Sequence, residues 1–306
     1  MAIVVIGTSF VDLKGFPDNV YIPKGRNAGR VEIIHGGVGR NVVEDIANVE
    51  LEPKFVSLID KSEMGTAVLE KLKKHKVNTD YIITDPNGMG MWLAIFDESG
   101  DVVGSVSKRP DMMPLAHLME YKGDEIFQDA DSIVVEVDID KDVIKQALKY
   151  ADKYNLPVYA VVSNMSIASK RRDLIQQIDC TVCNEQEAEI LFVKDFDGVD
   201  PEILVEELPD LIKNADIPSI VVTLGEKGAV YANKNGEAGY CPARPVKVAD
   251  TTGAGDAFFS GVAIGLTYGK SMAEAVEIGT RLASSVIVSS ENVCPRFLPS
   301  EFGIEI

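Results

Sequence analysis

The sequence predicts an α/β protein: a doubly wound, mostly parallel sheet with helices on both faces, together with a small β-sheet lid. Short apolar runs recur along the chain, and helix-length amphipathic stretches lie between several of them. Strands that are buried on both faces are uniformly apolar, and parallel strands need crossover helices between them. Two further segments alternate between apolar and polar residues, which predicts the lid.

The main sheet is predicted from its apolar runs in chain order. These runs are Ile3–Ile6, Lys54–Ile59, Ser132–Val137, Val158–Val162, Cys180–Cys183 and Ile220–Thr223. The amphipathic helices predicted between them are Met64–His75, Lys141–Tyr154 and Glu202–Asn214. Sheets of this kind bind ligands at the carboxyl ends of their strands, so motifs directly after strands are candidates for function.

The lid is predicted from alternation over Tyr21–Ile34 and Met89–Val106, the second with a hairpin turn at Asp97–Gly100. Alternation is typical of antiparallel strands with one solvent-exposed face. We expect segments 13–34 and 89–106 to form a lid over a core made of 1–12, 35–88 and 107–306. A pair of edge strands that extends the main sheet is the alternative.

The 306 residues are 46% hydrophobic and 25% charged, an ordinary globular composition. Lys and Arg number 30 and Asp and Glu number 48, so the formal net charge is −18. A surface this acidic repels phosphate backbones and anionic headgroups, which argues against nucleic acid or a membrane as partner. The short apolar start lacks a basic leader, and no stretch approaches the roughly 18 apolar residues of a membrane span. We therefore expect a cytoplasmic protein.

Cysteines and histidines give no sign of a metal site or a hydrolase triad. Cys180 and Cys183 have C-x-x-C spacing but lie in a strand-like run, where residues three apart point to opposite faces. We expect a buried structural pair in a reducing compartment. The histidines, His35, His75 and His117, are scattered, without an H-E-x-x-H motif or a Ser-His-Asp grouping.

The segment 250–261, with the sequence DTTGAGDAFFSG, is the most informative for chemistry. Gly253 and Gly255 permit a tight turn that opens a helix, and such a turn binds anions through free N–H groups and the helix dipole. Asp256 is then a candidate general base for a hydroxyl that attacks phosphorus. Gly253, Ala254 and Gly255 would stabilise charge on the transferred group. The alternative is a glycine turn with Asp256 as the helix N-cap.

Two other phosphate motifs are excluded by spacing. The glycines at 253 and 255 do not continue into G-x-G-x-x-G, and Gly265–Ser271 has three residues between its glycines where a P-loop has four. Asn184 and Glu187 follow a predicted strand and share one helical face, which suits a Mg²⁺ site that keeps most of its waters. Their alternative is a capping box.

Polar residues near the amino end could hold a polyol. Gly37 lies in a glycine-rich turn that leads into a helix, and Asn41 offers a donor and an acceptor. Asp12 comes soon after the first strand, and Glu136 ends another. All four would face the same crevice at the carboxyl ends of the strands.

Together these segments resemble the motifs of PfkB (ribokinase-like) carbohydrate kinases, in the same order and over most of the chain. The motifs are GGVGRN at 36–41, Asn184-x-x-Glu187, Thr223-Leu224-Gly225-x-x-Gly228 and DTTGAGD at 250–256. The resemblance implies a ribokinase-like fold and ATP-dependent phosphorylation of a sugar-like alcohol. Asp256 looks like the base, and Gly253, Ala254 and Gly255 look like the anion hole.

The resemblance also implies roles for the remaining residues. The nucleotide side comprises Asn184, Thr223, Gly225 and Gly228, with Glu187 reaching Mg²⁺ through water, and the substrate side comprises Asp12, Gly37, Asn41 and Glu136. Asp250 and Thr252 match a site for a monovalent cation such as K⁺. Paired lids could form a homodimer.

The run Asn27–Glu32 before the glycine motif looks most like pseudouridine kinases. The expected acceptor is therefore a primary hydroxyl of a sugar or nucleoside, with pseudouridine first and a ribose or fructose type of sugar as the alternative. Two hypotheses from other functional classes are a regulator that binds a sugar or nucleotide without transferring phosphate, and a nicotinamide-dependent oxidoreductase. The intact Asp256 turn argues against the first, and the missing G-x-G-x-x-G against the second.

Overall fold

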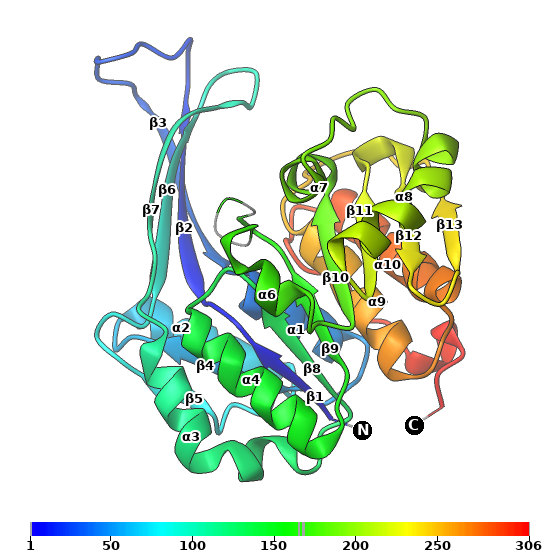
Figure 1. The fold of residues 1–306 in the computed structure, drawn as a ribbon. Coiled ribbons are helices and arrows are strands. Elements are labelled where there is room, and N and C mark those ends of the chain that lie inside the picture. Colours follow the sequence, from blue (N-terminus) through cyan, green and yellow to red (C-terminus); the bar gives the residue numbers. More distant parts are fainter. Residues whose placement is uncertain (1, 165, 167–168, 306) are drawn as a thin grey trace.

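The structure, a computed structural model, describes residues 2–164, 166 and 169–305, and two β-sheets organise this part of the chain (Figure 1). The large sheet has nine strands in the order β13-β12-β11-β10-β9-β8-β1-β4-β5. These are β1 (Ile3–Ile6), β4 (Lys54–Ile59), β5 (Ile82–Thr84), β8 (Ser132–Glu136), β9 (Val158–Val161), β10 (Cys180–Asn184), β11 (Ser219–Thr223), β12 (Ala229–Asn233) and β13 (Ala238–Cys241). Neighbours from β5 to β11 are parallel, whereas β12 and β13 pair antiparallel.

Helices cover both faces of the large sheet and bury two separate apolar cores. One face carries α1 (Val38–Asn48), α2 (Glu63–Lys74), α9 (Ala254–Thr267) and α10 (Met272–Ile287). The other carries α3 (Met113–Phe127), α4 (Lys141–Tyr154), α6 (Arg172–Ile175), α7 (Glu185–Phe192) and α8 (Pro201–Ala215). Val4 and Ile6 of β1 join one core, and Ile3 and Val5 join the other. The predicted doubly wound α/β architecture is confirmed.

Local sequence sets where several helices begin. Ser62 accepts a hydrogen bond from the Gly65 N–H and starts α2. Ser271 and Glu274 form a capping box at the start of α10. Before α8, Asp200 is the N-cap and Pro201 takes the first turn, where its missing N–H costs nothing.

The four-stranded small sheet, in the order β3-β2-β6-β7, stands apart from the large sheet (Figure 1). Its strands are β2 (Phe10–Pro17), β3 (Gly29–Gly36), β6 (Gly90–Phe96) and β7 (Val102–Lys108). Asp97–Gly100 forms the predicted hairpin turn, with the Gly100 N–H donating to the Asp97 carbonyl at 3.1 Å. The alternative of edge strands extending the main sheet is wrong.

The expected strand pattern over Tyr21–Ile34 is right only in its second half. Residues 21–28, which include Pro23 and Gly25, form no strand, and β3 begins at Gly29. Strand β3 pairs with β2, a strand that the sequence pattern did not predict. Proline lacks the N–H that a strand ladder needs, so pairing restarts beyond it.

Cys180 and Cys183 lie on β10 and belong to the two opposite cores, as the strand geometry predicts. Within the described ranges there is no group of three or more His, Cys, Asp or Glu side chains that could hold a metal ion. Those same ranges contain no helix long and apolar enough to cross a membrane.

Candidate active site

Two pockets meet at the turn before α9. The lid pocket, about 580 Å³, is bordered by the small sheet through Phe10, Asp12, Trp92 and Ser107. The loop pocket, about 770 Å³, is bordered by the turn after β11 and by the segment that follows β13. Thr252, Gly253 and Asp256 face the lid pocket, and Thr251, Ala254 and Gly255 face the loop pocket. The turn therefore forms the wall between them.

Gly253 is the N-cap of α9 and only glycine fits there. Its φ is +81°, and a Cβ would lie 2.1 Å from the backbone oxygen of Asn292. The turn thus opens directly into the helix, whose first N–H groups lack intrahelical partners. With the positive end of the helix dipole, these N–H groups would favour an anion between the two pockets, and that role stays a prediction.

Asp256 is the third residue of α9, so it is not the N-cap, and that alternative is wrong. Its Oδ2 accepts a hydrogen bond of 2.6 Å from Asn41 Nδ2. Desolvation by the surrounding protein raises the pKa of Asp256 to about 6, against the opposing effects of the Asn41 hydrogen bond and the Arg40 charge. A carboxylate with this pKa is ionised at neutral pH and is a stronger base than an ordinary aspartate.

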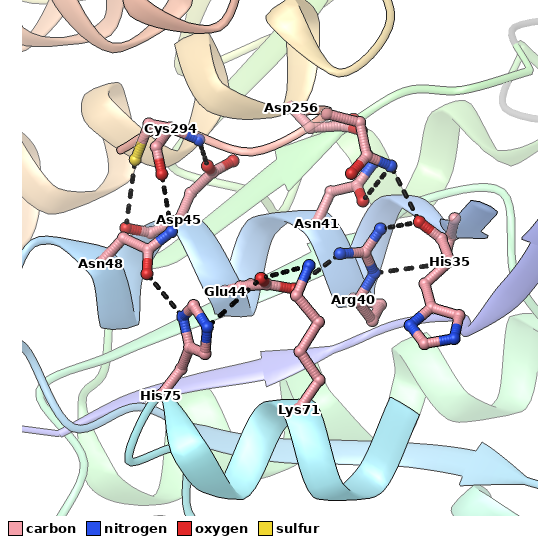
Figure 2. A network of polar contacts seen from close by, with 12 residues as sticks. His35, Arg40, Asn41, Glu44, Asp45, Asn48, Lys71, His75, Asp256 and Cys294 are labelled. Carbon is pink, nitrogen blue, oxygen red and sulfur yellow. Dashed lines mark hydrogen bonds and ion pairs between the residues drawn. The ribbon is translucent and has the colours of Figure 1, made fainter. Parts of the chain in front are cut away.

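Helix α1 is fixed in place by polar contacts on several sides (Figure 2). Arg40 Nη1 lies 2.6 Å from Glu44 Oε2, and both side chains are fully buried. Glu44 Oε1 also lies 2.8 Å from Lys71 Nζ on α2. Further along α1, Asp45 Oδ1 accepts from the Cys294 N–H at 2.6 Å. Arg40, the arginine of the GGVGRN motif, therefore holds the helix and does not line either pocket.

The structure brings all four predicted substrate residues to the lid pocket, together with Asp256. Gly37 has φ of +98°, and a Cβ there would lie 2.6 Å from the Thr8 carbonyl oxygen. Asp12 lies on β2, and burial raises its pKa against the charges of Lys14 and Arg40. Burial likewise raises the pKa of Glu136, whose Oε1 accepts from Thr8 Oγ1 at 3.0 Å.

Several residues that line the lid pocket were not predicted as site residues from the sequence. The aromatic side chains of Phe10 and Trp92 line it, as do Arg109 and Ser163. Arg109 Nη2 and Ser163 Oγ both donate to Asp138 Oδ2, at 2.5 and 2.9 Å. Asp138 and Ser163 lie just beyond the carboxyl ends of β8 and β9, which is a signal that could have found them.

Of the residues predicted for the nucleotide side, Thr223, Gly225 and Gly228 line the loop pocket together with Ala254 and Gly255. Thr223 ends β11, and Gly225–Lys227 form a single 3-10 turn. The rest of the pocket wall is largely apolar, with Val246, Val248, Phe258, Ala283 and Ile287. The apolar wall of the loop pocket suits a flat ring. One end of the pocket lies at the α9 turn.

Asn184 and Glu187 form the capping box that was the alternative for them. Asn184 Oδ1 accepts from the Glu187 N–H, and Glu187 Oε2 accepts from the Asn184 N–H, both at 2.8 Å. They are not among the residues that line the two pockets. Burial raises the pKa of Glu187 to about 7. Their role toward Mg²⁺ stays a prediction, as does that of Asp250 and Thr252 toward K⁺.

Asp250 and Thr252 nevertheless shape the turn. Asp250 Oδ1 accepts from the Thr252 N–H at 2.8 Å. Burial alone would raise the pKa of Asp250, but hydrogen bonds from Thr252 and the charge of Lys14 lower it overall. The ionised carboxylate therefore holds the backbone of the turn where α9 begins.

Two pockets that share the N-terminal turn of a helix, with a carboxylate of raised pKa at that turn, fit the positioning and charge stabilisation that phosphoryl transfer requires. The family model of the pfkB family carbohydrate kinases matches residues 2–295. The chain belongs to this family and is a phosphotransferase.

Individual relatives agree with this assignment. A guanosine-inosine kinase from Exiguobacterium acetylicum is 35% identical over 292 residues, which are 95% of each chain. A pseudouridine kinase from Escherichia coli (strain K12) is 25% identical over 289 residues, covering 93% of this chain and 90% of that one. The structure of Arabidopsis thaliana ribokinase complexed with ribose and ATP matches with a TM-score of 0.82 at 21% identity, over 97% of this chain and 96% of that one. This last likeness shows the fold alone.

Proposed function

We propose that the protein transfers the γ-phosphate of ATP to a primary hydroxyl of a 6-oxopurine nucleoside such as guanosine or inosine. The observation that carries the proposal is the turn at Gly253–Gly255, which separates a polar pocket from a largely apolar one and presents Asp256 to the polar side. The similarity to a guanosine-inosine kinase over nearly the whole chain supports the choice of acceptor.

ATP is assigned to the loop pocket. Its apolar wall suits an adenine ring, and the α9 turn at its end suits the terminal phosphates. The acceptor is assigned to the lid pocket, where Asp12 and Asn41 can hold ribose hydroxyls close to Asp256. The hydroxyl and the γ-phosphorus then approach each other across the turn.

The reaction is an in-line displacement. Asp256 takes the proton of the acceptor hydroxyl while its oxygen forms a bond to the γ-phosphorus, and the bond from that phosphorus to the β–γ bridging oxygen breaks. ADP leaves with that electron pair. The N–H groups of the turn stabilise the charge on the transferred group. The small sheet acts as a lid that excludes water from the site.

Mg²⁺ is expected to enter with the nucleotide. Glu187 lines neither pocket, but its Oε1 is not used by the capping box and would reach the ion through water, which suits an ion held mainly by phosphate and water oxygens. When bound, Mg²⁺ neutralises phosphate charge. The chain itself positions the phosphates through the α9 turn.

The base of the acceptor is assigned to the far end of the lid pocket. Phe10 and Trp92 provide aromatic faces, and the half-exposed Arg109 provides donors. An arginine suits the two acceptors O6 and N7 of a 6-oxopurine, whereas adenine presents an amino donor at position 6. Pseudouridine remains the second candidate, on the 25% identity to a pseudouridine kinase and the run Asn27–Glu32.

We further propose a homodimer through the lid. Apolar side chains from β3, β6 and β7 are exposed on the face away from the pocket: Val31 69%, Ile33 51%, Met91 43%, Leu93 46% and Val106 70%. Ile33, Leu13, Leu93 and Val106 form one row across the sheet by their register. A two-fold axis would bring this patch against its own copy, as isologous dimers do.

The test of the function is ADP release with Mg·ATP over a panel of acceptors. The panel comprises guanosine, inosine, adenosine, pseudouridine, ribose and fructose, each with K⁺ and with Na⁺. Guanosine and inosine are expected to exceed adenosine at least tenfold in kcat/KM. A preference for pseudouridine or a free sugar would overturn the choice of acceptor, and ATP binding without any turnover would favour the regulator.

A further inference from the structure

Lys14 is a buried lysine of the small sheet that lines neither pocket, and its ammonium group reaches the α9 turn that forms the wall between them. Its side chain is 4% exposed, and it lies on β2 two residues after Asp12, on the same face of the strand. Its Nζ donates a hydrogen bond of 3.2 Å to Thr252 Oγ1 in the α9 turn, 238 residues away in sequence. The contact joins the small sheet to the anion-binding turn.

The ammonium of Lys14 forms no direct ion pair in the described part of the chain. Its cross-strand partner on β3 is Glu32, but the Glu32 carboxylate is engaged by Arg30 at 2.8 Å. Among the residues that the structure describes, no carboxylate oxygen lies within the 4.0 Å of an ion pair from Lys14 Nζ. Its charge is felt by Asp12 and Asp250, whose pKa values it lowers at longer range.

A buried cation without an ion-pair partner is costly, because water is lost and no opposite charge replaces it. Lysines usually avoid that cost by extending their ammonium group to solvent. Lys14 instead directs its ammonium group at the α9 turn, to which the terminal phosphates of ATP are assigned above. The missing negative charge is the charge that an ATP phosphate would bring.

We propose that Lys14 is a catalytic residue that contacts the phosphoryl group in transfer. The inference rests on the proposed kinase function. In the step described above, Lys14 exchanges no proton: its N–H groups hold the non-bridging oxygens of the γ-phosphate while the acceptor bond forms and the bond to ADP breaks. Because Lys14 belongs to the lid, its charge reaches the phosphate when the lid covers the acceptor.

The first experiment compares Lys14→Met and Lys14→Arg with Lys108→Met, an exposed lysine on strand β7 of the same sheet. Lys14→Met is expected to lower kcat by about 10²–10³, the usual loss for one transition-state donor, with acceptor KM changed less than about threefold. Lys14→Arg keeps the charge and is expected to retain about a tenth of the wild-type rate or more. Lys108→Met should match the wild type. A Lys14→Met kcat within threefold of wild type, in a folded protein, overturns the proposal.

The second experiment needs no turnover and so separates this inference from the proposed function. Affinities for a non-hydrolysable ATP analogue and for ADP are measured by calorimetry, with acceptor present. Lys14→Met is expected to weaken the analogue about tenfold or more and ADP by less than about twofold, because only the analogue carries the γ-phosphate. Equal losses for both nucleotides would reject the contact. If the wild type binds both nucleotides but phosphorylates no acceptor, the kinase function is rejected. The difference in affinity between the two nucleotides then still shows whether Lys14 contacts the γ-phosphate.

Discussion

The side-chain amide of Asn41, in the first turn of α1, donates a 2.6 Å hydrogen bond to Oδ2 of Asp256, in the first turn of α9. The Asn41 amide is oriented by Asn292, whose Nδ2 lies 3.3 Å from Asn41 Oδ1 (Figure 2 shows the Asn41–Asp256 pair). Two helices that begin at glycine turns far apart in sequence thus meet at one carboxylate. The bond occupies one carboxylate oxygen and leaves the other for the acceptor hydroxyl.

Asp256→Asn removes the carboxylate proposed as the base while keeping the size of the side chain. We expect kcat to fall by about 10³ or more, because positioned proton transfer typically contributes 10²–10⁴-fold and Asn cannot accept the proton. The affinity for ATP should change little, since the α9 turn is intact. Single-turnover kinetics and nucleotide titration measure the two effects. A variant that retains a tenth of the wild-type kcat would exclude Asp256 as the base.

The raised pKa of Asp256 predicts a pH profile. Only the ionised carboxylate can take a proton, so kcat/KM is expected to fall as the pH drops through about 6, the pKa of the folded protein. Asn41→Leu removes a hydrogen bond that lowers this pKa, and the inflection should move to higher pH. An Asn41→Leu inflection at lower pH than in the wild type would contradict the assignment.

Asp256 also predicts a difference in stability. Its pKa is raised in the folded state, so folding favours the protonated form, and stability is lost as the pH rises from about 4 through about 6. The Asp256→Asn variant does not lose this stability, because the asparagine side chain does not ionise. The variant should therefore be more stable than the wild type by roughly 1–3 kcal/mol at pH 7.5. Near pH 4 the two proteins should be about equal, as urea unfolding at the two pH values would show. A variant less stable at pH 7.5 would mean that the ionised carboxylate stabilises the fold.

Much of the large sheet could be predicted from the sequence because its strands are buried on both faces. Ser132–Val137 and Ile220–Thr223 were predicted within one residue of β8 and β11, since strands that lie between two helical layers are mostly apolar. Gly37 and Gly253 were predicted instead from glycine-rich turns that lead into helices, and α1 and α9 begin there. The small sheet was harder to predict, because a strand with one exposed face tolerates polar residues. In sequence such a strand resembles a loop, and β2 is an example.

The missed parts of the site depend on contacts across the fold. Arg109 follows the last strand of the small sheet and meets Asp138 beyond β8. Lys14 sits in an alternating strand, where a lysine normally marks the solvent face, yet that face is turned to the α9 turn. No local pattern distinguishes a lysine buried in this way, because the burial is made by residues more than two hundred positions away.

Arg109 predicts the choice of base. Arg109→Met is expected to lower kcat/KM for guanosine and inosine about 5- to 150-fold, the range of one bidentate pair, and that for adenosine less than about threefold. Arg26→Met, an exposed arginine in the loop between β2 and β3, is the control and should leave all acceptors unchanged. Steady-state kinetics on the three nucleosides decide the matter. Equal losses on guanosine and adenosine would mean that Arg109 only holds Asp138 in place.

The exposed apolar face of the lid predicts a dimer that a single charge would disrupt. Leu93 lies in the middle of the patch, between Leu13 and Val106 in the register, and is 46% exposed. Leu93→Asp would place two carboxylates against each other across a two-fold axis in an apolar interface, so a monomer is expected. Val193→Asp changes a side chain that is 90% exposed at the end of α7 and should leave the dimer intact. Light scattering coupled to size-exclusion chromatography gives the mass of each protein. A monomeric wild type at about 10 μM would show that this face has no partner of its own kind at concentrations where a stable dimer forms.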